Sequence, residues 1–194
     1  MKYHYFICDV FTEQRFGGNQ LAVLPDAQKL SDWQMQQIAR EFNFSETAFV
    51  LPAEAGHTRK VRIFTPTTEI PFAGHPNIGT AFVLAETGAL GKEIPGTVLF
   101  EEKAGLVSIE IQADPGAPTS FELKAPQVLT LQEFPAIGSV AKALSLRENE
   151  IVVTTHAPTV ASVGLPFLFV EVVNSSVLSQ VRIDMAEFDR LLVE

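Results

Sequence analysis

The apolar residues of this chain fall into many short runs, each bounded by glycine, proline or polar turn residues. No run approaches the roughly 18–20 apolar residues that span a bilayer, so we expect no membrane partner. Runs rich in alternating, aromatic or β-branched residues predict strands, and the few segments with helical spacing lie between them. This interleaving predicts an α+β fold rather than a parallel, doubly wound sheet.

The first part of the chain carries the clearest element signals. Ser31 precedes a helical pattern with Gln34 three residues on, the spacing of a capping box. The expected inner face of this helix is Trp33, Ile38, Ala39 and Phe42. Pro76 suits the first turn of a second helix that closes near Gly88. Its expected apolar stripe is Ile78, Ala81, Phe82 and Ala85. Strands are expected at residues 3–11, 21–24, 46–51, 61–65, 98–100, 107–111 and 121–123, with a turn at 112–119.

A second segment of helices and strands begins at about residue 125. We expect helices at residues 137–144 and 185–192, the latter capped by Asp184, and extended chain at 151–154 and 167–172. The change of pattern predicts two domains, residues 1–124 and residues 125–194.

Composition excludes several classes of protein. The 194 residues are 46% hydrophobic and carry a net charge of −9, which excludes intrinsic disorder and disfavours nucleic acid as a partner. Cys8 is the only cysteine, so neither an intrachain disulfide nor a cysteine zinc site can form. The polar first residues do not resemble a signal peptide, and we expect a cytoplasmic protein.

The densest group of candidate functional residues is the segment 72–80. Gly74 can adopt a positive φ and allow a ligand close to the backbone. A helix that begins at Pro76 would leave the N–H groups of residues 77–79 free to bind an anion such as a carboxylate. His75 could bind the ligand or move a proton. The same pattern also suits an ordinary helix entry with a histidine at its cap.

Three further polar residues lie next to predicted strands. Glu46 follows Ser45 and begins an otherwise apolar strand, where partial burial would raise its pKa and suit it to general acid/base catalysis. A glutamate at the end of a strand is also commonly a solvated charge. Asn19 follows two glycines and offers an amide donor, although it could serve the turn alone.

Other motifs are excluded by missing partners. The segment 74–80 lacks the lysine of a phosphate-binding P-loop. Ser139 and Lys142 have the spacing of some acyl-transferring hydrolases, but the accompanying motifs are absent. His4, His57 and His156 have no ligand spacing to one another, so the sequence predicts no metal site.

Several segments resemble, in order and spacing, the signatures of the PhzF (phenazine biosynthesis-like) family. They are Asp9-Val10-Phe11-Thr12, Phe16-Gly17-Gly18-Asn19-Gln20, Leu21-Ala22-Val23, Phe44-Ser45-Glu46-Thr47-Ala48-Phe49, Ile63-Phe64-Thr65-Pro66 and Phe72-Ala73-Gly74-His75-Pro76. Gly164-Leu165-Pro166-Phe167-Leu168 resembles the entry to the second half of the family. The resemblance covers essentially the whole chain.

The resemblance implies a diaminopimelate-epimerase-like fold of two α+β lobes related by a pseudo-twofold axis. It also implies an isomerase without cofactor or metal, whose founding activity moves a proton in trans-2,3-dihydro-3-hydroxyanthranilate. Glu46 matches the catalytic acid/base, and His75 with Gly74 matches the motif that binds substrate and handles the proton. We expect Asn19, Ser45 and Asn77 to help bind a small carboxylated substrate, and we expect a homodimer.

The chain departs from the family in its second lobe. Nothing in it matches the family's Asp-Pro-x-x-Gly motif, because Asp114-Pro115-Gly116 lies before that lobe. We therefore expect an incomplete second lobe. The first interpretation is a PhzF-like isomerase that uses Glu46 for proton transfer. The alternative is an inactive or fragmentary relative that binds a small anion or a partner chain.

Overall fold

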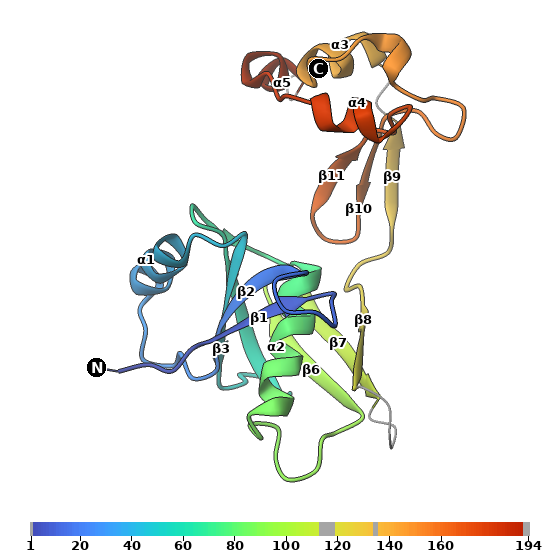
Figure 1. The fold of residues 1–194 in the computed structure, drawn as a ribbon. Coiled ribbons are helices and arrows are strands. Elements are labelled where there is room, and N and C mark those ends of the chain that lie inside the picture. Colours follow the sequence, from blue (N-terminus) through green and yellow to red (C-terminus); the bar gives the residue numbers. More distant parts are fainter. Residues whose placement is uncertain (1, 113–118, 134–135, 192–194) are drawn as a thin grey trace. The chain divides into compact units, whose positions relative to one another are not determined.

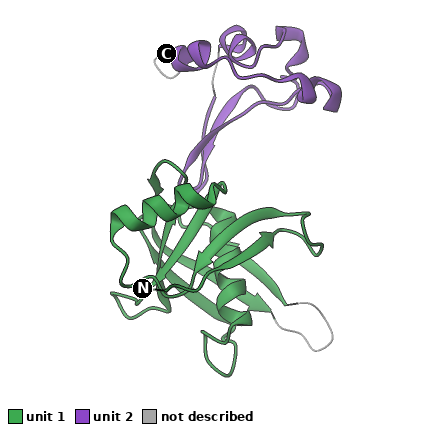
Figure 2. Ribbon diagram, turned by 60° about the vertical axis from the view of Figure 1, so that its left-hand side comes forward, with its two compact units in different colours: residues 1–127 green, residues 128–194 purple. Residues whose placement is uncertain are grey.

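The computed structural model describes residues 2–112, 119–133 and 136–191. They belong to two units, residues 1–127 and residues 128–194, coloured green and purple in Figure 2. The boundary expected between residues 124 and 125 lies close to this division. Most of the expected turn at 112–119, with Asp114-Pro115-Gly116, falls outside the described residues.

An eight-stranded mixed sheet forms the frame of the first unit, in the order β1-β2-β3-β4-β6-β7-β8, with β5 paired to β4. The β2–β3 and β4–β6 pairs are parallel and the others are antiparallel. The predicted strands of this unit are confirmed to within a few residues, and β5 was not predicted. The strands are β1 (Phe6–Val10), β2 (Asn19–Leu24), β3 (Glu46–Leu51), β4 (Arg59–Phe64), β5 (Glu69–Ile70), β6 (Thr97–Glu102), β7 (Gly105–Gln112) and β8 (Ser120–Lys124).

Helix α2 (Gly74–Glu86) lies inside the curve of this sheet (Figure 1). It contacts β1 and β8, which are opposite edges of the sheet, and also β2, β3 and β7. Nine of its thirteen residues are buried, as expected for a helix that is apolar on all sides. The predicted single stripe is therefore wrong: Phe82 is 41% exposed, whereas Val83 and Leu84 are buried.

Two glycines explain how α2 packs and ends. A Cβ at Gly79 would lie 2.6 Å from Leu21 Cδ2 and 2.8 Å from Val10 Cγ2, so only glycine lets the helix approach β1 and β2 this closely. Gly88 adopts a positive φ, and the N–H of Ala89 reaches back to the carbonyl of Leu84. This is the glycine-terminated helix end expected near residue 88.

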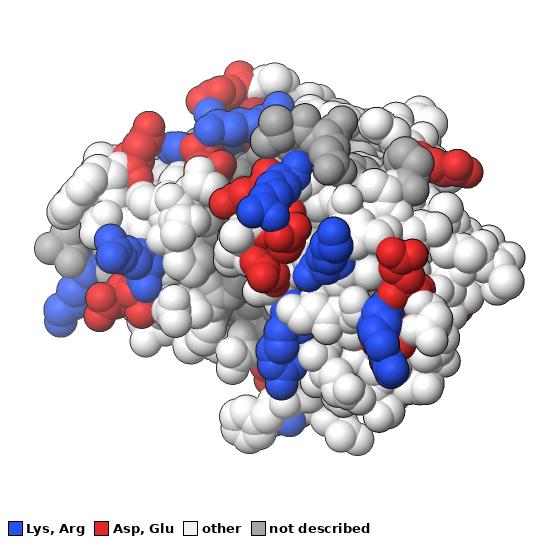
Figure 3. Space-filling model, turned by 90° about the horizontal axis from the view of Figure 1, so that it is seen from above, with Lys and Arg blue, Asp and Glu red and all other residues white. Residues whose placement is uncertain are grey.

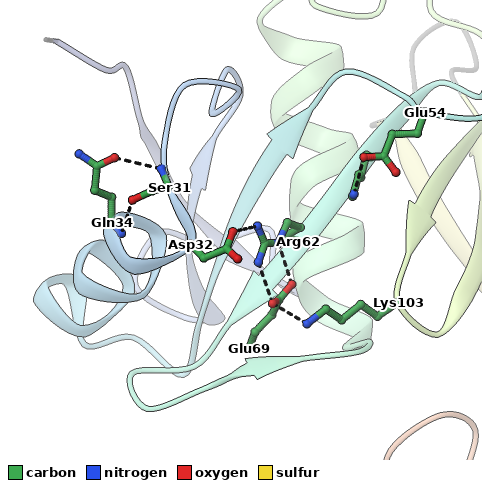
Figure 4. Close-up of polar contacts among 8 residues, drawn as sticks. Ser31, Asp32, Gln34, Glu54, Arg62, Glu69 and Lys103 are labelled. Carbon is green, nitrogen blue, oxygen red and sulfur yellow. Dashed lines mark hydrogen bonds and ion pairs between the residues drawn. The ribbon is translucent and has the colours of Figure 1, made fainter.

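Helix α1 (Asp32–Phe42) packs on β3 and β4. The predicted capping box is confirmed, because Ser31 Oγ accepts from Gln34 N and Gln34 Oε1 accepts from Ser31 N (Figure 4). Met35 and Ala39 form the buried face. Trp33 is 70% exposed, so its predicted place on the inner face is wrong. Trp33 lies two residues before Met35, which places the two side chains about 200° apart around the helix axis.

A cluster of four charged side chains ties α1 to the strands beneath it (Figure 4). Arg62 of β4 donates to both oxygens of Glu69 at 2.8 Å and to Asp32 at 2.6 Å. Lys103 also donates to Glu69, at 2.6 Å. Each charge in this cluster has a partner of opposite sign. More widely, acidic and basic side chains are intermixed on the face drawn in Figure 3.

The second unit combines a three-stranded antiparallel sheet, in the order β11-β10-β9, with short helices. Residues 151–154, expected as a strand, contribute only the bridge from Ile151 to Val172. The strand expected at 167–172 ends at Phe169, and β9, β10 and α4 were not predicted. The elements are β9 (Thr130–Glu133), α3 (Ile137–Ala143), the 3-10 helix η1 (Glu148–Glu150), β10 (Thr159–Ser162), β11 (Pro166–Phe169), α4 (Ser175–Gln180) and α5 (Met185–Leu191).

The core of the second unit lies among its helices. Asp184 Oδ1 accepts from the backbone N–H groups of residues 186 and 187, which confirms the predicted cap of α5. Its hydrophobic cluster contains the buried residues Val140, Ala141, Ala143, Ile151 and Leu191. In both units, none of the described helices is long and apolar enough to cross a membrane.

Candidate functional site

Glu46 and His75, far apart in the sequence, meet in the first unit. Glu46 is the first residue of β3, and His75 is the second residue of α2. Glu46 Oε2 lies 3.4 Å from His75 Nε2, and the two side chains are only 18% and 8% exposed. The sheet that wraps α2 thus brings a carboxyl and an imidazole together where little water reaches them.

Asn19 and Ser45 extend this pair into a chain of polar contacts. Ser45 Oγ donates to Asn19 Oδ1 at 3.2 Å, so the amide nitrogen of Asn19 faces His75 Nδ1, also at 3.2 Å. With the amide in this orientation, its N–H donates and Nδ1 accepts, so the ring proton lies on Nε2. This assignment follows from the hydrogen-bond network. The neutral His75 therefore presents an N–H toward Glu46.

The facing atoms of Glu46 and His75 retain unused hydrogen-bonding capacity. Within the described structure, Glu46 Oε2 and His75 Nε2 are both buried and neither has a hydrogen-bond partner. Their 3.4 Å separation exceeds the 2.7–2.9 Å of a charge-assisted hydrogen bond. Buried polar atoms without partners are costly, and they often mark a place where a ligand or water belongs.

Burial lowers the pKa of His75, although the charge of Glu46 and a hydrogen bond with the Gln20 backbone act in the opposite direction. The imidazole is therefore neutral at neutral pH. A neutral imidazole can donate a hydrogen bond to developing negative charge, while the neighbouring carboxylate accepts a proton. The pair is thus equipped for general acid/base chemistry.

The start of α2 differs from the expected one. The helix begins at Gly74, with Ala73 as its N-cap, and not at Pro76. Since residue 77 can already bond to the carbonyl four residues before it, the free N–H groups are those of Gly74 and His75 rather than those of residues 77–79. The positive end of the helix dipole therefore lies beside the Glu46–His75 pair.

Gly74 does not adopt the positive φ expected for it, because it is the first residue of the helix. A Cβ built on Gly74 would meet nothing within 4 Å. The backbone at this point is thus open to close approach from outside. The predicted room for a ligand is present, but it comes from open space and not from a special backbone conformation.

Asn77 does not occupy the place expected of a substrate-binding residue. Its side chain is fully buried, and its Nδ2 donates to the carbonyl of Ala73 at 3.0 Å. The amide therefore supports the first turn of α2 from within.

Sequence reasoning missed Glu102, the last residue of β6. Both carboxyl oxygens of Glu102 are buried, and burial raises its pKa to about 8 although the neighbouring amide of Asn77 acts in the opposite direction. The signal was available: Val98 and Phe100 are buried, and the period of two places Glu102 on the same face.

A hollow of about 1070 Å³ lies elsewhere in the first unit. It is an open groove beside β1, the outer side of α2 and β8, and neither Glu46 nor His75 lines it. Cys8 lies in its wall, where burial and the charge of Asp9 raise the thiol pKa to about 11. The thiol is thus the inert one expected in a strand.

Among the described residues, no three potential ligands of a metal are grouped together.

Comparison with known proteins places this geometry in context. The family model described as phenazine biosynthesis-like protein matches residues 8–193. An uncharacterized isomerase of Mesorhizobium japonicum is 41% identical over 192 residues, which are 97% of this chain and 62% of that protein. A trans-2,3-dihydro-3-hydroxyanthranilate isomerase of Pseudomonas chlororaphis is 36% identical over 84% of this chain and 58% of its own length.

Solved structures share the fold. A predicted epimerase from Pseudomonas aeruginosa superposes with a TM-score of 0.82 at 30% identity, over 98% of this chain and 67% of that one. A hydroxyproline epimerase from Agrobacterium vitis, 19% identical with a TM-score of 0.53, covers 85% of this chain and 51% of its own and shares the fold alone. The diaminopimelate-epimerase-like fold class predicted from the sequence is confirmed. The chain spans about three fifths of the length of its curated relatives.

Proposed function

The chain belongs to the phenazine biosynthesis-like family. We propose that it acts as an isomerase that moves a proton within a small, unsaturated carboxylated substrate. The observation that carries this proposal is the buried pair of Glu46 and His75, whose facing atoms lie 3.4 Å apart and have no hydrogen-bond partner among the described residues. A proton-transfer reaction requires one group that accepts a proton and neighbouring donors that stabilise the charge left behind.

The roles follow from the chemistry of the two side chains and of the first turn of α2. Glu46 removes a proton from carbon as general base and returns it at another position of the substrate. Neutral His75 donates from Nε2 to the substrate while the charge is displaced. The free N–H groups of Gly74 and His75 hold a carboxylate or enolate oxygen at the positive end of α2. No step needs a metal or an organic cofactor.

The relatives support the class of substrate. Those named trans-2,3-dihydro-3-hydroxyanthranilate isomerase act on a small carboxylate, and one is 36% identical to this chain. We propose a substrate of the same class for this chain. Asn19 and Ser45 would orient it indirectly, since their hydrogen bonds fix the tautomer and position of His75.

The proposal is tested by proton exchange in D₂O. The chain is incubated with trans-2,3-dihydro-3-hydroxyanthranilate in the presence of EDTA, and mass spectrometry follows deuterium incorporation and product. Product that carries solvent deuterium supports the proposal, and activity that EDTA abolishes and a metal restores contradicts it.

A second function is favoured by the open backbone at Gly74 together with the two free N–H groups. These features suit a module that binds a small anion without turnover. Binding of the substrate without deuterium incorporation would favour this second function.

A further inference from the structure

A buried glutamate lies on the inner side of α2, outside the acid/base pair. Glu102 ends β6, and its two carboxyl oxygens are buried without a hydrogen-bond partner in the described structure. Asn77 of α2 lies beside it, and the amide oxygen of Asn77 is also buried and unpartnered. A carboxylate in such a place would be a buried charge without a counter-ion, which is among the costliest groups in a protein.

Three consecutive residues tie the turn after β6 to the segment that leads into α2. Glu102 lies against Asn77, Lys103 pairs with Glu69, and the N–H of Ala104 donates to the carbonyl of Pro71 at 3.1 Å. Displacement of Glu102 would therefore act directly on the segment that precedes Gly74 and His75.

The contact between Glu102 and Asn77 extends to the N-cap of α2 through the side-chain amide of Asn77. Ala73 has no side chain that could cap the helix, and Asn77 Nδ2 donates to its carbonyl. If Glu102 were a carboxylate, its charge would attract the amide nitrogen of Asn77 and draw it away from the Ala73 carbonyl. If it carries a proton, it leaves this bond intact.

We propose that Glu102 is a neutral acid in the folded protein and a positioning residue for the first turn of α2, which its ionisation loosens. Burial supports this, because it raises the pKa of Glu102 to about 8 although the neighbouring amide of Asn77 acts in the opposite direction. The proposal deepens the proposed function, since the turn carries Gly74 and His75. The protonation state of Glu102, however, can be measured without any substrate.

The other charged groups around the end of β6 have partners of their own. On α2, His75 faces Glu46. Arg62 of β4 and Lys103 of the turn after β6 pair with Glu69, and Lys60 of β4 pairs with Glu54. Glu101, on the opposite face of β6, accepts the backbone N–H groups of residues 54, 55 and 57. No change in these pairs is needed for Glu102 to titrate.

The test is a pH titration of the ¹⁵N-labelled chain by NMR between pH 6 and pH 10. We expect the side-chain NH₂ signals of Asn77 and the backbone N–H signals of Gly74 and His75 to shift together, with one midpoint near pH 8. Glu102→Gln, which keeps the shape of the neutral acid, should abolish this shift. Glu110→Gln, an exposed glutamate of β7, is the matched control and should leave it unchanged.

Glu46→Gln should also leave the midpoint near pH 8, which separates this inference from the role of Glu46. Asn77 signals that stay constant from pH 6 to pH 10 would overturn the proposal, as would an unchanged titration in the Glu102→Gln chain. If that variant does not fold, the carboxyl ¹³C signals of the unsubstituted chain decide. One glutamate with a midpoint near pH 8 supports the proposal, and midpoints all below pH 6 overturn it.

Discussion

Two polar clusters lie on the same curled sheet and differ in how well they are paired. In the cluster of Arg62, Asp32, Glu69 and Lys103, each charge meets an opposite charge within 2.8 Å. In the cluster of Ser45, Asn19, His75 and Glu46, the two central atoms face each other at 3.4 Å and retain unused hydrogen-bonding capacity. The first arrangement stabilises the fold, and the second is one that a ligand would complete.

The largest expected effect is on catalytic activity, which should depend on the Glu46 cluster far more than on the Arg62 cluster. Glu46→Gln removes the proton acceptor and should lower the rate of deuterium exchange at least about 10²-fold, the lower range for general acid/base catalysis. Glu69→Gln changes a carboxylate in the paired cluster and should alter that rate less than about tenfold. Full activity of Glu46→Gln would remove Glu46 from the mechanism.

The free energy of unfolding should instead depend on the Arg62 cluster. Arg62→Met leaves Glu69, whose side chain is 13% exposed, with Lys103 as its remaining partner. We expect the free energy of unfolding to fall by about 1–2 kcal/mol, measured by urea denaturation. Lys60→Met, on the same strand, loses a pair with Glu54, whose side chain is 72% exposed; it is the control and should cause no measurable change. Equal losses in both variants would show that burial does not distinguish the Arg62 cluster.

A smaller effect concerns the titration of His75. Its burial lowers the pKa below the ordinary 6.5, and the charge of Glu46 partly offsets this. We therefore expect an imidazole NMR midpoint below pH 6.5, and a still lower midpoint in Glu46→Gln because the offsetting charge is lost. An upward shift in that variant would mean that Glu46 does not face His75 in solution.

The sequence predicted best those elements whose signals are local. Strand β3 was expected at residues 46–51, and the cap of α1 at Ser31 depends on two residues three positions apart. In the second unit, β9 was missed because all four of its residues are exposed, so no alternation of apolar and polar residues marks it. The single apolar face predicted for α2 was wrong because its enclosure depends on strands distant in the sequence.

For the candidate site, the resemblance identified Glu46 and His75, and the structure brings them together. The resemblance could not show at which residue α2 begins. Pro76 suggested the first helical position but occupies the third, which moved the free N–H groups to Gly74 and His75. Asn77 was expected to face a ligand, yet a polar residue in the first helical turn can equally well point inward. That choice depends on the packing against β6, which a single sequence does not display.

The enclosure of α2 also has a consequence for how the chain is made. Synthesis delivers β1 to β5 and α2 before β6 to β8, but α2 contacts β8 as well as β1. The helix therefore remains uncovered on one side until residue 124 has left the ribosome. Because domains tend to fold as units during synthesis, a nascent chain shorter than this exposes apolar helix surface. Arrest of translation between α2 and β8 should yield a species that chaperones retain.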